Sequence, residues 1–209
     1  MPKQIYRITH FKNLEFILKN GLHCCNSLIK DPNFIGIGNP SIIDRRSQII
    51  VPVDPKGVLN DYVPFYIGPR SPMLYQIFKG NAGGFPCVQE DIVYIVCDVQ
   101  KVIDSKLQFV FTDGHAVDKL THNFYNDIDL WETLDLNTIY GDFWKNTEDD
   151  MQRQRRKQSE FLVYQNVPIN CILGIGVMNN EMKVEIEELL QLTNCENIPC
   201  KVKLEWYYF

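Results

Sequence analysis

Short segments rich in Val, Ile, Tyr and Phe recur along this sequence and alternate with short helical segments, which strongly limits the possible folds. Strands are expected at residues 6–10, 49–53, 62–67, 91–99, 107–112, 160–164, 171–177 and 201–208. A regular alternation of one strand with one long helix is missing. We therefore expect a mixed α+β fold.

The helical segments are short and carry terminal signals. They are expected at residues 13–20, 71–80, 129–136, 148–158 and 181–192. Gly21 stands at a C-terminal cap position, Ser71 precedes a first-turn proline, and Asp129 with Glu132 has capping-box spacing. Residues 23–48 show no sustained periodicity and contain several glycines and prolines, so we expect a long loop that covers a ligand.

The size and composition fit one domain over residues 1–209, since 45% of the side chains are apolar. No apolar run approaches the roughly 20 residues of a membrane span, and the N-terminus lacks the apolar segment of a secretory signal. We expect a cytoplasmic monomer. Seven cysteines without a C-x-x-C pair are interpreted as reduced thiols.

Charge and histidine spacing limit the function classes. A formal net charge of -5 argues against broad electrostatic binding to duplex DNA, so any nucleic-acid site must be small and local. The four histidines lack the spacing of zinc ligands, and we predict no metal site.

Three groups of residues carry potential chemistry. Thr9 and His10 precede the first helix, Arg45 and Arg46 end the long loop, and a basic run leads to Glu160. A histidine at a strand end is more often a structural hydrogen-bonding group, and charged runs are usually solvated. The pattern alone does not decide whether Glu160 is a structural or a catalytic carboxylate.

Five blocks of the sequence carry a resemblance to a known family. They are Tyr-Arg-Ile-Thr-His-Phe-Lys-Asn-Leu at 6–14, Asp-Tyr-Val-Pro-Phe-Tyr at 61–66, Pro-Arg-Ser-Pro-Met-Leu-Tyr at 69–75, Phe-Thr-Asp-Gly-His-Ala at 111–116, and Arg-Arg-Lys-Gln-Ser-Glu-Phe-Leu-Val at 155–163. In this order they resemble the signature blocks of the DarT family. DarT proteins are toxins that transfer ADP-ribose from NAD+ to DNA bases, and a macrodomain antitoxin, DarG, removes the modification.

The resemblance implies an ADP-ribosyltransferase fold, in which two small antiparallel sheets flank an NAD-binding cleft and helices lie at the periphery. It also implies a set of residues that bind NAD+ as co-substrate. His10 anchors the nicotinamide end, the loop at 23–48 covers the dinucleotide, and Arg46, preferred over Arg45, contacts the phosphates. The implied cofactor-binding residues are Thr9, His10, Asn13, Gly21, Arg45 and Arg46.

Glu160 and Arg46 are the implied catalytic residues. Cleavage of the nicotinamide–ribose bond develops an oxocarbenium-like cation, which a nearby carboxylate stabilises, and the same carboxylate can accept a proton from the attacking base nitrogen. A planar arginine fork matches pyrophosphate oxygens. We expect Glu160 to be an exposed cleft carboxylate that contributes little to packing.

The implied acceptor is single-stranded DNA, because the target base must reach the cleft. The expected DNA-binding residues are Tyr75, which would stack a base, and His122, Arg153, Arg155 and Arg156. Thymine is the preferred target. The alternatives are guanine, RNA, a protein or water as acceptor, and a non-enzymatic module that only binds single strands.

Overall fold

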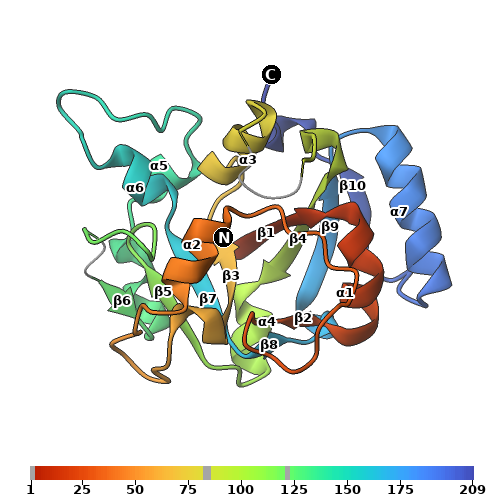
Figure 1. The fold of residues 1–209 in the computed structure, drawn as a ribbon, viewed down its shortest axis with the longest axis horizontal. Helices are drawn as coiled ribbons and strands as arrows, with labels where there is room; N and C mark the ends of the chain where they lie inside the picture. Colours follow the sequence, from red (N-terminus) through yellow and green to blue (C-terminus); the bar gives the residue numbers. More distant parts are fainter. Residues whose placement is uncertain (1–2, 82–85, 121–122) are drawn as a thin grey trace.

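The strands form one large sheet and one small sheet in the computed structural model, which describes residues 3–81, 86–120 and 123–209 (Figure 1). The order in the large sheet is β10-β9-β4-β1-β3-β7-β5-β6, and β2 pairs with β8. The strands are β1 Gln4–His10, β2 Leu22–His23, β3 Tyr62–Tyr66, β4 Ile92–Asp98, β5 Phe109–Thr112, β6 Phe124–Tyr125, β7 Glu160–Tyr164, β8 Asn166–Val167, β9 Ile172–Val177 and β10 Cys200–Val202.

The large sheet consists of two four-stranded halves that meet at β1 and β3. Among the described residues, β1 pairs with β4 along its whole length, whereas its register with β3 consists of Tyr6 opposite Tyr66. All pairs are antiparallel except β10 with β9. The expected α+β class is confirmed, and the two expected sheets are joined into one at this single pair.

Seven α-helices are described at the periphery of the sheet. They are α1 Leu14–Asn20, α2 Pro40–Arg46, α3 Pro72–Phe78, α4 Val99–Asp104, α5 Leu136–Tyr140, α6 Arg153–Lys157 and α7 Asn180–Leu192. In Figure 1, α1 and α7 lie toward the half with β9 and β10, and α5 and α6 toward the half with β5 to β7. The Ser71 side chain caps α3 by accepting from Leu74 N, as expected.

Two expectations about the first half of the chain are wrong. The segment 23–48 contains α2, which begins with Pro40 after Asn39 caps Ser41 N, and these signals were hidden by the surrounding glycines and prolines. The segment expected as a strand at 49–53 pairs only through one isolated bridge among the described residues, and it leads into a turn at Asp54 and Pro55. Its backbone contacts include the bridge from Ile50 to Val58 and hydrogen bonds from Val51 N to Gly57 O and from Leu59 N to Ile49 O.

Three expected boundaries in the second half also change. The segment at 129–136 is a 3-10 helix, Ile128–Thr133, followed by α5, and its cap is Asp127 instead of Asp129. The helix expected at 148–158 is shortened to α6. The strand expected at 201–208 stops at Val202, and its aromatic residues continue as the 3-10 helix Leu204–Trp206 and a buried Tyr207.

Both faces of the central strands are buried. Ile5 of β1 and Ile95 of β4 belong to one apolar cluster with α7, whereas Tyr6 and Tyr94 face the opposite cluster. Each fully buried large apolar side chain stabilises the fold by about 1.5–3 kcal/mol. The two filled faces therefore hold β1 firmly, and β1 carries the first functional block.

All seven cysteines are free thiols, and five of them are buried. Burial raises the pKa of Cys200 to about 11.

Over the described residues, no helix is long and apolar enough to cross a membrane.

Candidate active site

A cavity of about 600 Å³ lies where the two halves of the sheet diverge, and its volume is within the range of small-molecule sites. The end of β1, the segment before α2, α2 itself, β3, α3 and the start of β7 all contribute to its wall. Its polar side chains include Arg7, Thr9, Arg46, Asn60, Tyr66, His115 and Glu160.

Glu160 is the first residue of β7 and has both carboxylate oxygens bound. Oε2 accepts from Arg46 Nη1 at 2.8 Å, and Oε1 accepts from the Ala116 backbone N–H at 2.9 Å. Only 4% of the residue is exposed. The expectation of an exposed carboxylate is therefore wrong, because β7 lies between β3 and β5 and both carboxylate oxygens are covered by Arg46 and the Ala116 backbone.

Arg46 ends α2 and reaches across the cavity to Glu160. Its Nη2 is buried and has no hydrogen-bond partner among the described residues. A buried unsatisfied donor costs about 1–3 kcal/mol. A ligand oxygen in the cavity would satisfy it, and this fits the expected contact with a phosphate.

A second arginine borders the same cavity. Arg7 Nη1 donates to the Pro64 carbonyl at 2.9 Å, and it therefore spans β1 and β3 where the two halves separate. Burial, followed by the nearby charge of Arg46, lowers the pKa of Arg7 to about 10. The cavity wall thus carries two neighbouring guanidinium groups, an arrangement that favours an anionic ligand.

Thr9, His10 and Asn13 occupy the turn from β1 into α1. Thr9 lines the cavity. Asn13 Nδ2 donates to Thr9 Oγ1 at 3.0 Å and to the Ile35 carbonyl at 2.9 Å, and its Oδ1 accepts from Ile35 N at 2.8 Å. Asn13 therefore ties the segment before α2 to the start of α1.

His10 is 5% exposed, and its Nδ1 accepts from Lys12 N at 3.2 Å. Its ring stacks on Phe11 with 5.0 Å between the centroids. Burial lowers its pKa. In this structure His10 caps the turn beside the cavity, and its contact with nicotinamide stays a prediction.

Gly21 and Arg45 complete the expected NAD-binding set. Gly21 lines the cavity with φ +81, and a Cβ there would lie 2.7 Å from the Val167 carbonyl oxygen, so only glycine fits. Arg45 turns away from the cavity, and its Nη2 donates to the Val117 carbonyl at 2.9 Å. The preference for Arg46 over Arg45 therefore agrees with the geometry.

Tyr66 and His115 also face Glu160. Burial, followed by the charge of Glu160, raises the pKa of Tyr66 well above its usual value. His115 Nε2 lies 3.9 Å from Glu160 Oε1, and burial lowers the pKa of its imidazole. Sequence reasoning missed Tyr66, although its position opposite Glu160 follows from the pairing of β3 with β7.

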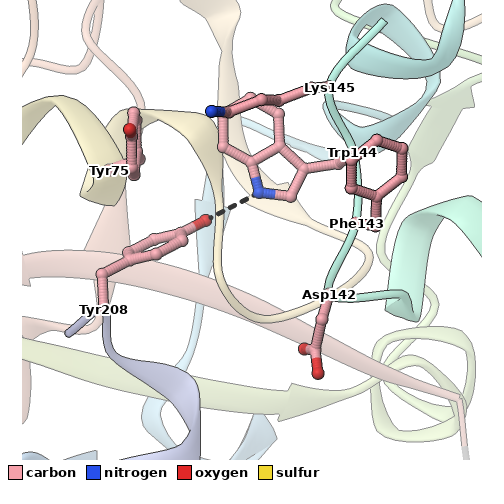
Figure 2. A pocket seen from close by; sticks show the side chains of 6 residues that line it. All are labelled: Tyr75, Asp142, Phe143, Trp144, Lys145 and Tyr208. Atoms are coloured by element: carbon pink, nitrogen blue, oxygen red, sulfur yellow. Dashed lines mark hydrogen bonds between the residues drawn. The ribbon is translucent and has the colours of Figure 1, made fainter. Parts of the chain in front are cut away.

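Tyr75 lies in a separate aromatic pocket (Figure 2). Its ring meets Trp144 and Tyr208 edge-on, at centroid distances of 5.5 and 5.1 Å, and Trp144 Nε1 donates to the Tyr208 hydroxyl. The α3 residues that line the large cavity are Pro72, Met73, Gln76 and Ile77. Tyr75 therefore does not line the cavity that holds Glu160, and its contact with a base stays a prediction.

The arginines of α6 are held by acidic side chains. Arg153 pairs with Asp150, Arg155 with Asp113, and Arg156 with both Asp135 and Asp150. Contact of these residues with DNA phosphates would require exchange of an ion pair. His122 lies outside the described residues.

Gln154 of α6 and Gln158, which directly follows this helix, do line the cavity. Sequence reasoning did not single them out, because the neighbouring charges dominated the segment. The buried carboxylate can stabilise a developing cation, and the guanidinium groups beside it can hold an anion. Among residues 3–81, 86–120 and 123–209, no cluster of three or more His, Cys, Asp or Glu side chains could hold a metal ion.

Comparison with known proteins shows which family this chain is similar to. Residues 6–208 match the family model described as "DarT: ssDNA thymidine ADP-ribosyltransferase". A DNA ADP-ribosyl transferase of Escherichia coli O127:H6 is 37% identical over 204 residues, which cover 98% of this chain and 93% of that protein.

Solved structures of a Thermus sp. 2.9 DarT are also similar. The complex with ADP-ribosylated single-stranded DNA has a TM-score of 0.91 and 34% identity and covers 99% of this chain and 97% of that one. The complex with NAD+ has a TM-score of 0.85 and 34% identity and covers 99% and 98% of the two chains.

Proposed function

The chain belongs to the DarT family of single-stranded DNA thymidine ADP-ribosyltransferases, and we propose that Arg46 and Glu160 carry out the transfer in its cleft. It is an NAD-dependent enzyme that attaches ADP-ribose to a base of single-stranded DNA and releases nicotinamide. The observation that carries the residue assignment is the buried Arg46–Glu160 pair on the wall of a cavity of about 600 Å³.

Glu160 is proposed to act at the ribose. When the bond between nicotinamide and C1′ breaks, its electron pair leaves with nicotinamide and positive charge develops on the ribose. The fixed Glu160 carboxylate stabilises that charge. A thymine ring nitrogen then bonds to C1′, and its proton passes to the carboxylate, which acts as general base.

Arg46 is proposed to hold the pyrophosphate. Its Nη2, which has no partner in the described part of the chain, and its paired Nη1 form a fork, and the adjacent Arg7 adds a second positive charge at the wall. Thr9 and Gly21 are proposed to line the nicotinamide side with His10 and Asn13 behind them, and Arg45 supports this site indirectly. The surface formed by α6, including Arg153 and Arg156, is proposed to face the DNA.

The experiment that tests this function compares acceptors. The enzyme is incubated with NAD+ and single-stranded oligonucleotides that differ only in whether one thymine is replaced by cytosine. We expect nicotinamide release and an ADP-ribosyl mass increase only for the thymine-containing strand. Modification of both strands, of a guanine, or of RNA alone would contradict the proposed thymine specificity.

The biological setting follows from the family resemblance. We propose that the chain, as one domain, is a cytoplasmic monomeric toxin and that a DarG-like macrodomain protein removes its modification. Expression of the wild-type chain should stop growth, and co-expression of such a macrodomain should restore it. Growth arrest that is equal for a Glu160→Gln variant would contradict a toxicity based on transfer.

A further inference from the structure

The position of the Glu160 carboxylate depends on a loop that contains neither Arg46 nor Glu160. Residues 113–118, here called the cradle loop, connect β5 to the segment before β6. The loop provides the Ala116 N–H that binds Glu160 Oε1, and it carries His115 at 3.9 Å from the same oxygen. A shift of the cradle loop would therefore move the carboxylate.

Two side chains, those of Thr112 and Arg45, fasten the ends of the cradle loop. The fully buried Thr112 donates from Oγ1 to the Gly114 carbonyl at 2.6 Å and accepts from the Glu160 backbone N–H at 3.1 Å. Arg45 Nη2 donates to the Val117 carbonyl at 2.9 Å. The loop is thus tied to β7 at one end and to α2 at the other.

Arg155 of α6 holds the first half of the cradle loop. Its Nη1 donates to the Asp113 carbonyl at 3.3 Å and to Asp113 Oδ1 at 3.2 Å, while Nε donates to Gln152 Oε1 at 3.0 Å. The backbone carbonyl of Arg155 accepts from His115 N at 3.2 Å. The side chain is 13% exposed, and it does not line the large cavity.

Gly114 leaves the space that the Arg155 side chain occupies. A Cβ at Gly114 would overlap Arg155 Nη1 and lie 2.9 Å from Cγ and 3.0 Å from Cζ. Contacts this short along the whole side chain, including its stem, require it to move as a unit. Gly114 and Arg155 therefore form one packing element beneath the loop that holds Glu160.

We propose that Arg155, packed on Gly114, is a positioning residue that sets the Glu160 carboxylate through the cradle loop. This inference rests on the proposed role of Glu160, and it gives Arg155 a role different from the phosphate contact that its position in a basic run predicts. The reason is that its hydrogen bonds with the described residues include those to Asp113, to Gln152 and to the backbone of His115. A small misplacement of a reacting group is sufficient to cost about a hundredfold in rate.

The test measures transfer kinetics and DNA affinity separately. For Arg155→Met, we expect kcat to fall about tenfold to a hundredfold, with KM for NAD+ and Kd for a single-stranded oligonucleotide changed less than about twofold. Gly114→Ala should also lower kcat and leave KM and Kd nearly unchanged, although this variant keeps the positive charge of Arg155. The double variant should be no slower than the worse single variant, because both changes remove the same contact.

Three comparisons keep the test specific. Arg155→Lys retains the charge opposite Asp113 and should recover part of kcat. Lys183→Met removes an equal charge on α7, far from the cavity, and should leave kcat unchanged. Arg153→Met measures what the loss of a charge on α6 does to DNA affinity.

The proposal is overturned by any of three results. One is a larger loss of DNA affinity than of kcat in Arg155→Met, and another is an unchanged kcat in Gly114→Ala. The third is that neither Gly114→Ala nor Arg155→Lys remains folded, since the contact would then be purely structural. A Glu160→Gln variant with normal transfer would instead contradict the proposed role of Glu160, whatever the Arg155 variants do.

Discussion

Removing one partner of the Arg46–Glu160 pair should destabilise the protein as well as inactivate it. The side chains are 11% and 5% exposed, and the nitrogen–oxygen distance is 2.8 Å. Replacing one member of a buried pair costs about 3–5 kcal/mol, because the remaining charge is left without its partner. The pair borders a cavity, so we expect the lower end of that range for Glu160→Gln and for Arg46→Met.

The expected shift is large enough to measure. One kcal/mol moves the Tm of a domain of about 150–250 residues by about 2–4 °C, so about 3 kcal/mol lowers Tm by about 6–12 °C. The double variant Arg46→Met/Glu160→Gln removes both charges. It should be more stable than the sum of the single losses predicts, with a coupling energy of about 0.5–3 kcal/mol.

Thermal and urea unfolding of the four proteins measure this coupling. The control is Lys183→Met, which breaks an exposed pair with Glu187 and should change stability by about 0–1 kcal/mol. Strict additivity of the Arg46 and Glu160 losses would refute the reasoning, because it would mean that the two buried charges do not depend on each other. Single variants as stable as Lys183→Met would refute it as well.

The remaining predictions concern the cover of the cleft and the buried lysine of α6. Asn13→Ala removes three hydrogen bonds that hold Thr9 and Ile35, so KM for NAD+ should rise more than kcat falls; an unchanged KM in steady-state kinetics would contradict this. Hydrogen exchange in residues 24–39 should slow when NAD+ is added to the wild-type protein, and unchanged exchange with NAD+ bound would remove this segment from the site. Burial, followed by the charge of Arg70, lowers the pKa of Lys157 to about 8 from 10.5, so between these pH values the unfolded chain binds more protons at this residue. The unfolding free energy of wild type relative to Lys157→Met should therefore rise from about pH 8 to 10.5 in urea titrations at each pH, and a constant difference would show that Lys157 does not titrate in this way.

The parts of the fold predicted well from sequence are those in which local pattern and tertiary burial agree. Residues 160–164 and 92–98 are strands because β-branched and aromatic side chains fill both faces of the sheet. The pattern predicted a strand wrongly where aromatic residues are buried outside any pair of strands. Tyr207 is such a case, since its hydroxyl donates to the Ile92 carbonyl and its ring packs outside the strand ladder.

The candidate site was predicted in its residue types but not in its contacts. The resemblance at 155–163 proposed Glu160 as the catalytic residue, which stays a prediction. The Ala116 N–H that binds its carboxylate lies more than forty residues earlier in the chain, and no local pattern connects the two. The basic run suggested phosphate contacts. The acidic partners Asp113, Asp135 and Asp150 are visible only once the chain is folded.

Single-turnover transfer is the measurement that tests the central claim most directly. Wild type, Glu160→Gln and Arg46→Lys are each mixed with saturating NAD+ and a single-stranded oligonucleotide that carries one thymine, at a temperature where all three are folded. Loss of the stabilising carboxylate should slow transfer by Glu160→Gln by about a hundredfold to a thousandfold, and Arg46→Lys should also be slow because it lacks the fork. A Glu160→Gln variant that binds both substrates and transfers at the wild-type rate would contradict the account.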